Sequence, residues 1–211
     1  NHAVNMYGLK DNVARKAGTM GKEENKEMEF WTQEEFQAFL EFVADKPISY
    51  FAFEMLYWTG IREGELLALT PADFNFEKKT LRINKSYQRL EGKDVITDPK
   101  TPKSNRTIVM PDFLAVEMED FISSLYGIKD DDRIFTISKS YLHHEMDRGA
   151  KLAGVKRIRI HGLRHSHISL LIDLGFSALA IGERVGHEAV DITYHYAHLF
   201  PTVQTDMAAQ L

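Results

Sequence analysis

The sequence predicts an α+β fold, mainly helical, in which five or more helices surround one small three-stranded antiparallel sheet. Two observations predict it. Helix-starting and helix-ending signals recur along most of the chain, and three short strand-like runs cluster between residues 80 and 110. A length of 211 residues with 44% hydrophobic residues suffices for one folded unit of roughly 180 residues and a tail.

The first 29 residues are typical of a linker. They contain no sustained apolar period, and three glycines precede a run of charged residues. We therefore expect residues 1–29 to be an interdomain linker from a missing upstream domain, 30–201 to form the folded domain, and 202–211 to form a short tail helix.

Local signals justify each helix in turn. Thr32 and Glu35 form a capping box, and Pro47 opens a helix that is apolar almost all round and so belongs in the core. Three later helices each close at a glycine. The expected helices run from Thr32 through Val43, from Pro47 to Gly60, from about Arg62 to Leu69, from Pro111 onward, from Ser140 to Ala153, from His161 to Leu174 and from Ser177 to Val185. Thr80 to Gln88, Asp94 to Thr97 and Arg106 to Met110 are expected to be the three strands of a β-meander.

Composition excludes several classes of protein. The longest apolar stretch, residues 50–58, is interrupted by Glu54 and is far shorter than the ~20 residues that span a bilayer. The chain has no cysteine, which excludes disulfides, thiolate nucleophiles and zinc sites of the cysteine type, and which suits a reducing compartment.

Charge is distributed in blocks. The net charge of −5 argues weakly against nucleic-acid binding, but residues 77–108 and 136–164 each carry a net charge of +5. These blocks could fold into one positive face with an acidic back, or they could be separate solvated surfaces.

Six of the nine histidines fall between residues 161 and 198. His161 and His165 have the i, i+4 spacing of a zinc site, but the glutamate of such motifs is missing and Arg164 between them would repel a dication. His161 and Arg164 instead share one face at a helix start, an arrangement that suits a phosphate. The alternative is an exposed arginine beside a hydrogen-bonded histidine.

Further motifs complete an ordered set. Arg62 lies in Thr-Gly-x-Arg, Lys100 in a predicted turn, His161 and Arg164 in His-x-x-Arg, His187 in Gly-His, and Tyr196 in Tyr-Ala-His-Leu. In order and spacing, this set resembles the tyrosine recombinase family of phage and conjugative-transposon integrases. The resemblance extends from about residue 30 to 201.

The resemblance implies a catalytic domain that follows a helical core-binding domain and often an arm-binding domain. It implies transesterification, in which a tyrosine attacks a DNA phosphodiester, forms a 3′-phosphotyrosine bond and releases a 5′-hydroxyl without metal, cofactor or ATP. The implied catalytic residues are Arg62 and Arg164 as phosphate clamps, His161 as general base, Lys100 as general acid, His187 as a phosphate ligand and Tyr196 as nucleophile, with Glu65 as a supporting carboxylate.

Physical chemistry is consistent with these roles. Two planar guanidinium groups can bind the non-bridging oxygens bidentately, and a tyrosine with a pKa near 10 needs a base. Lys103 is the local rival of Lys100. Tyr194 is the rival of Tyr196, and only one of the two can face a pocket from a helix. Glu65 could equally be a solvated surface glutamate.

The implied partners are double-stranded DNA at a specific attachment or recombination site, further copies of the chain in a homo-oligomer, expected to be a tetramer, and accessory excision or bending factors. The tail of residues 202–211 could pack on its own chain or dock on a neighbouring copy, as in the integrases that the chain resembles. No membrane is implied, and the expected location is the bacterial cytoplasm at the nucleoid. A type IB topoisomerase-like enzyme and a non-catalytic DNA-binding module are the alternatives. The compact motif spacing favours the recombinase over the first, and the complete set of six residues argues against the second.

Overall fold

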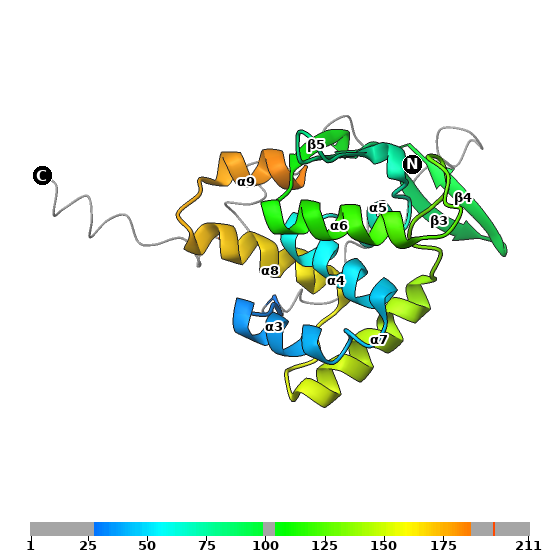
Figure 1. Cartoon of the computed structure of the whole chain (residues 1–211). Helices are drawn as coiled ribbons and strands as arrows, with labels where there is room; N and C mark the ends of the chain where they lie inside the picture. The colour runs from blue at the N-terminus through cyan, green and yellow to red at the C-terminus, as the bar shows by residue number, and fades with distance from the viewer. Residues whose placement is uncertain (1–27, 99–103, 187–195, 197–211) are drawn as a thin grey trace, which may run out of the picture.

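The computed structural model describes residues 28–98, 104–186 and 196 (Figure 1). As predicted, these residues form a mainly helical structure with a small three-stranded antiparallel sheet, but a separate two-stranded sheet is also present. None of the described helices is long and apolar enough to cross a membrane. The helices are α3 (Gln33–Glu41), α4 (Pro47–Thr59), α5 (Glu63–Leu66), α6 (Asp112–Ser124), α7 (Lys139–Ala153), α8 (Ile160–Asp173) and α9 (Ala178–Val185), with a 3-10 turn η1 (Pro71–Asp73). The strands are β1 (Phe74–Asn75), β2 (Thr80–Ile83), β3 (Ser86–Leu90), β4 (Lys93–Thr97) and β5 (Arg106–Val109).

Helix α4 forms the centre of the structure. Its side chains are buried on nearly all sides, and it packs against α5, α6 and α8 (Figure 1). Pro47 opens the helix and Gly60 ends it in the left-handed conformation, with φ of 64°. The prediction of a core helix from its unbroken apolar sequence is therefore confirmed.

Two helix starts illustrate how local signals act. Thr32 and Glu35 make both bonds of the predicted capping box at α3. Helix α5 is shorter than predicted and ends at Leu66, because the amides of Ala68 and Leu69 bond to carbonyls three residues back and tighten the chain.

The predicted β-meander is wrong. β2 pairs with β1 on one side and with β5 on the other, whereas β3 pairs with β4 alone among the described residues. The expected strand from residue 80 to 88 divides at Asn84 and Lys85, where the Lys85 ammonium binds Asp73 at 2.5 Å and Thr70 at 3.1 Å. This anchor lies at the bend between the two sheets.

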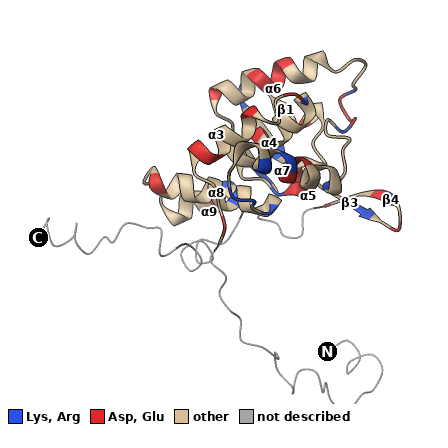
Figure 2. Ribbon diagram, turned by 90° about the horizontal axis from the view of Figure 1, so that it is seen from below, with Lys and Arg blue, Asp and Glu red and all other residues tan. Residues whose placement is uncertain are grey.

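The β3–β4 hairpin extends away from the helices (Figures 1 and 2). Glu91 and Gly92 join its strands with φ of 49° and 79°, the two positive φ values of a type I′ turn.

The apolar core has two parts among the described residues. The larger one surrounds α4, and the smaller one forms where α9 lies against α8. The smaller part holds Tyr196 against Ile168 and Ile172 of α8 and Ile181 and Val185 of α9. The packing of α9 on α8 thus brings distant segments of the chain to the end of α4.

Candidate functional site

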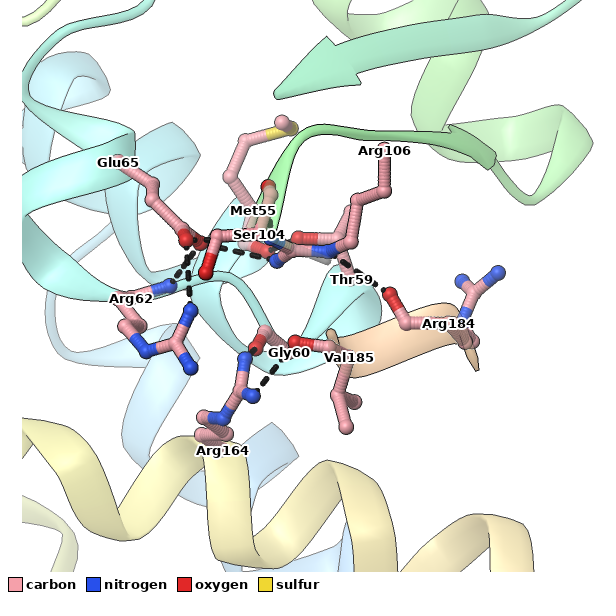
Figure 3. A network of polar contacts seen from close by, with 10 residues as sticks. All are labelled: Met55, Thr59, Gly60, Arg62, Glu65, Ser104, Arg106, Arg164, Arg184 and Val185. Atoms are coloured by element: carbon pink, nitrogen blue, oxygen red, sulfur yellow. Dashed lines mark hydrogen bonds and ion pairs between the residues drawn. The ribbon is translucent and has the colours of Figure 1, made fainter. Parts of the chain in front are cut away.

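Four polar side chains converge where α4 ends (Figure 3). They are Arg62, the N-cap residue of α5, Glu65 within α5, Arg106 of β5 and Arg164 of α8. Gly60 provides the turn. Glycine is favoured here for two reasons. The residue has the left-handed conformation, and a Cβ atom added to it would lie only 2.6 Å from Cδ2 of His167. The carbonyl of Gly60 also accepts a hydrogen bond from Arg164 Nη1 at 2.6 Å.

Arg62 is the N-cap residue of α5. Its backbone amide donates to Glu65 Oε2 at 2.8 Å, and its Nη1 donates to Glu65 Oε1 at 2.9 Å. The side chain retains 35% of its exposure. Arg62 is thus fixed from one side while part of its side chain faces solvent.

Glu65 is buried, with only 5% exposure. Besides Arg62 it binds Arg106, whose Nη2 lies 2.9 Å from Oε2 and whose Nη1 lies 3.1 Å from Oε1. Burial alone would raise the pKa of Glu65, but the hydrogen bonds and charges of Arg106 and Arg62 outweigh burial and hold this pKa below its ordinary value. The interpretation of Glu65 as a surface glutamate is therefore wrong.

Arg164 is almost fully buried, at 2% exposure. Its Nη1 and Nη2 donate to the carbonyls of Gly60 and Val185, both at 2.6 Å, while its Nε is buried and has no hydrogen-bond partner among the residues that the structure describes. Burial, followed by the charges of Arg62 and Arg106, lowers the pKa of Arg164 to about 9, so the group stays cationic at neutral pH. The alternative of an exposed Arg164 is wrong.

His161 lies in the first turn of α8 and is exposed. Partial desolvation, the charge of Arg164 and then that of Arg62 lower the pKa of His161 below its ordinary value of 6.5. The imidazole is therefore mainly neutral at pH 7 and able to accept a proton.

Tyr196 is buried, at 3% exposure, and its hydroxyl forms a hydrogen bond with Nδ1 of His165. Burial raises the pKa of Tyr196, and the charge of Arg164 opposes that rise. His165 is itself in edge-to-face contact with His161, with 4.8 Å between ring centroids. One histidine pair on α8 thus connects the predicted base to the predicted nucleophile.

Sequence reasoning missed three contributors to this site: His165, considered only as a zinc ligand, and Arg106 and Arg184, which it did not single out. Arg184 donates from Nε to Nε2 of the buried His167 at 3.0 Å and fixes α9 to α8. The density of histidines was the available signal for His165. In the described part of the chain, no group of three or more His, Cys, Asp or Glu side chains could hold a metal ion. Lys100, Lys103, His187 and Tyr194 lie outside the described residues.

Comparisons with known proteins identify the family of the chain. The model of the phage integrase family matches residues 29–202. The ICEBs1 integrase of Bacillus subtilis is 32% identical over 95% of this chain and 57% of its own length. The integrase of Staphylococcus phage L54a is 30% identical over 76% of this chain and 50% of its own length. The chain therefore spans only about half the length of these curated relatives.

Solved structures share the fold. The Tn1549 transposon integrase in complex with a circular intermediate DNA superposes with a TM-score of 0.75 at 21% identity, covering 90% of this chain and 68% of that one. The catalytic domain of bacteriophage HP1 integrase superposes with a TM-score of 0.61 at 19% identity, covering 88% of this chain and 95% of that one.

Proposed function

Because the chain belongs to the phage integrase family, we propose that it is the catalytic domain of a site-specific DNA recombinase that cuts and rejoins double-stranded DNA through Tyr196. One observation carries this proposal. The guanidinium groups of Arg62 and Arg164, which are 102 residues apart in the sequence, lie beside the turn at Gly60 (Figure 3), and the positive charge of Arg164 opposes the rise in the pKa of Tyr196.

The two arginines supply electrostatic stabilisation. When a tyrosine oxygen attacks phosphorus, negative charge accumulates on the non-bridging oxygens, and buried guanidinium groups bind such charge strongly. Arg164 is held by two carbonyls, and its buried Nε is unpaired within the described part of the chain, while Arg62 is held by Glu65 and remains partly exposed. Both cations are thus fixed in place before a phosphate arrives, which lowers the cost of reorganisation.

Proton transfer completes the reaction. The Tyr196 oxygen forms a bond to phosphorus, the bond from phosphorus to the 5′-oxygen breaks, and the electron pair leaves with that oxygen. In the proposal, His161 accepts the tyrosine proton and Lys100 donates a proton to the 5′-oxygen, while His187 binds a phosphate oxygen. One phosphodiester is exchanged for one phosphotyrosine ester, so the step needs no ATP. In the proposal, the two arginines and Lys100 supply the positive charge for which a metal would otherwise be needed.

The charge distribution supports a DNA partner. Lysine and arginine residues lie in α7 and α8, whereas α3 and α6 contain acidic residues and no lysine or arginine (Figure 2). A pI near 6 is therefore compatible with polyanion binding on one side.

The proposal also covers the domains of the chain, its assembly on DNA and its location. Residues 1–29 are a linker to a core-binding domain, 30–201 the catalytic domain, and 202–211 a tail that docks on a neighbouring copy in a tetramer on DNA. The protein acts at the nucleoid in the bacterial cytoplasm, with accessory excision or bending factors. Deletion of residues 202–211 should weaken assembly on DNA, and unchanged multimerisation would contradict that role of the tail.

Covalent capture tests the function. The protein is incubated in EDTA with a pool of nicked duplexes of random sequence, and DNA adducts are sought on a denaturing gel. We expect an EDTA-resistant adduct that Tyr196→Phe abolishes and the matched variant Tyr194→Phe retains. Loss in Tyr194→Phe alone would move the nucleophile, and no adduct with the unaltered chain, alone or joined to a core-binding domain, would contradict the enzyme and favour a DNA-binding module. Transfer of the trapped strand to a new partner duplex would separate a recombinase from a topoisomerase-like enzyme.

A further inference from the structure

Arg106 is the first residue of β5, and its side chain is only 6% exposed. Its guanidinium makes four hydrogen bonds to three different segments of the chain. Nη1 and Nη2 bind the two oxygens of Glu65 at 3.1 and 2.9 Å, Nη1 also donates to the carbonyl of Ser104 at 3.0 Å, and Nε donates to the carbonyl of Arg184 at 3.0 Å (Figure 3).

The contact with Glu65 fixes the group that holds Arg62. Each Glu65 oxygen binds one nitrogen of Arg106 and one of Arg62, so the carboxylate bridges two guanidinium groups. A bidentate pair defines the plane of both partners. Because Arg106 sets the plane of the Glu65 carboxylate, it also sets the direction in which the Arg62 guanidinium points.

The contact with Arg184 fixes the end of α9. The last carbonyls of a helix have no partner within the helix, and here Arg106 binds that of Arg184 while Arg164 binds that of Val185. The chain then turns at Gly186, with φ of 72°, and leads in the sequence to His187. Two arginines from different elements therefore hold the helix end that precedes this proposed phosphate ligand.

We propose that Arg106 is a positioning residue for strand transfer, which aligns Arg62 through Glu65 and fixes the end of α9 together with Arg164. The inference rests on the proposed function and deepens it. Arg106 touches no reacting atom in this arrangement. Lysine could keep the charge of Arg106, but its single nitrogen cannot reach both Glu65 oxygens and two carbonyls in the plane that the guanidinium occupies.

The test compares Arg106→Lys with Arg148→Lys in the complete chain. Arg148 is the matched control, because its guanidinium also binds both oxygens of one carboxylate, that of Asp45, while it lies in α7 and its other partner is Glu145 of the same helix. Cleavage is measured in single turnover at saturating DNA and well below the unfolding midpoint of each variant. We expect Arg106→Lys to cleave roughly 10- to 100-fold more slowly, as for other residues that orient functional groups, with unchanged DNA affinity. Arg148→Lys should retain the rate of the unaltered chain.

A second comparison separates positioning from general support of the fold. If Arg106 acts through Arg62, the double variant Arg62→Lys with Arg106→Lys should lose less activity than the product of the two single losses. Should Arg106→Lys fail to fold, Glu65→Gln replaces it and should show the same pattern with Arg62→Lys.

The outcomes are distinguishable. An active unaltered chain with a normal rate for Arg106→Lys, or with losses that multiply, overturns the positioning role alone. No adduct from the unaltered chain, alone or joined to a core-binding domain, overturns the proposed function, and the positioning role with it.

Discussion

Glu65 binds Arg62 twice, at the backbone amide and at the guanidinium, with distances of 2.8 and 2.9 Å. The first contact caps α5 at its N-terminus, and the second orients the side chain that precedes the helix. The Glu65 carboxylate therefore both caps the helix and orients the Arg62 guanidinium. Replacing Glu65 should change both the free energy of unfolding and the rate of DNA cleavage.

Replacing Glu65 with glutamine should destabilise the fold at neutral pH. Removing one partner of a buried ion pair leaves uncompensated charge, and we expect a loss of roughly 3–5 kcal/mol in the free energy of unfolding. Because the pKa of Glu65 is lowered in the folded state, its contribution is present above the ordinary value of 4.5 and is lost as the pH falls through the folded pKa. Denaturant titrations at neutral and acidic pH measure this, and a difference that does not shrink in acid would contradict it.

Glu54 should make the free energy of unfolding fall as the pH rises, which is opposite to the effect of Glu65. This side chain is 4% exposed within α4, and burial, followed by the charge of Glu117, raises its pKa to about 8. Between pH 4.5 and 8 the folded state binds a proton that the unfolded state lacks. The contribution of Glu54 is thus full below pH 4.5 and falls by up to about 1.4 kcal/mol per pH unit until it is lost above pH 8.

Glu54→Gln should remove that slope and unfold at higher denaturant than the unaltered chain at pH 8. Glu119→Gln, at an exposed glutamate of α6, is the matched control and should keep the slope. Parallel curves for Glu54→Gln and the unaltered chain across this range would refute the assignment.

Substitution of Gly60 by alanine should destabilise the end of α4. The left-handed conformation costs a residue with a Cβ atom about 1–3 kcal/mol, and that atom would also press on the ring of His167. Thermal unfolding measures the loss. Gly154→Ala is the comparison, because Gly154 has a similar φ of 68° but a Cβ atom added there would meet nothing within 4 Å, so this variant should lose less.

The protonation of His161 should determine how the rate of DNA cleavage changes with pH below 7. A general base must be neutral, and the pKa of His161 is lowered below 6.5. Cleavage should therefore be flat near pH 7 and decline as the pH falls through that lowered pKa. His161→Gln should be slow and should lose the decline, while His165→Gln should retain it. The reverse result would make His165, which contacts the Tyr196 hydroxyl, the proton acceptor.

Lys100 should act on the leaving group. A 5′-bridging sulfur leaves without protonation, so Lys100→Ala should cleave normal DNA slowly and a phosphorothiolate substrate at nearly the rate of the unaltered chain. Lys103→Ala is the matched variant and should cleave both substrates normally. Rescue of Lys103→Ala instead would assign the acid to that residue.

The sequence by itself determined the helices and the ordered set of candidate residues. The capping box at Thr32, the proline at 47 and the glycines at 60, 154 and 186 act within one turn of the chain, so their effects are local and can be predicted. The motifs from Arg62 to Tyr196 were visible for the same reason, because each is a short pattern.

Only the tertiary structure decided how these parts meet. The contact of Arg106 with Glu65 joins residues 41 positions apart, its contact with Arg184 spans 78, and that of Arg164 with Gly60 spans 104. The strand pairing was predicted wrongly for the same reason, because β5 pairs with β2 although the β3–β4 hairpin separates these two strands in the sequence. Such contacts depend on burial and charge balance in the folded chain, because a buried cation or carboxylate is stable only where a partner from another element reaches it.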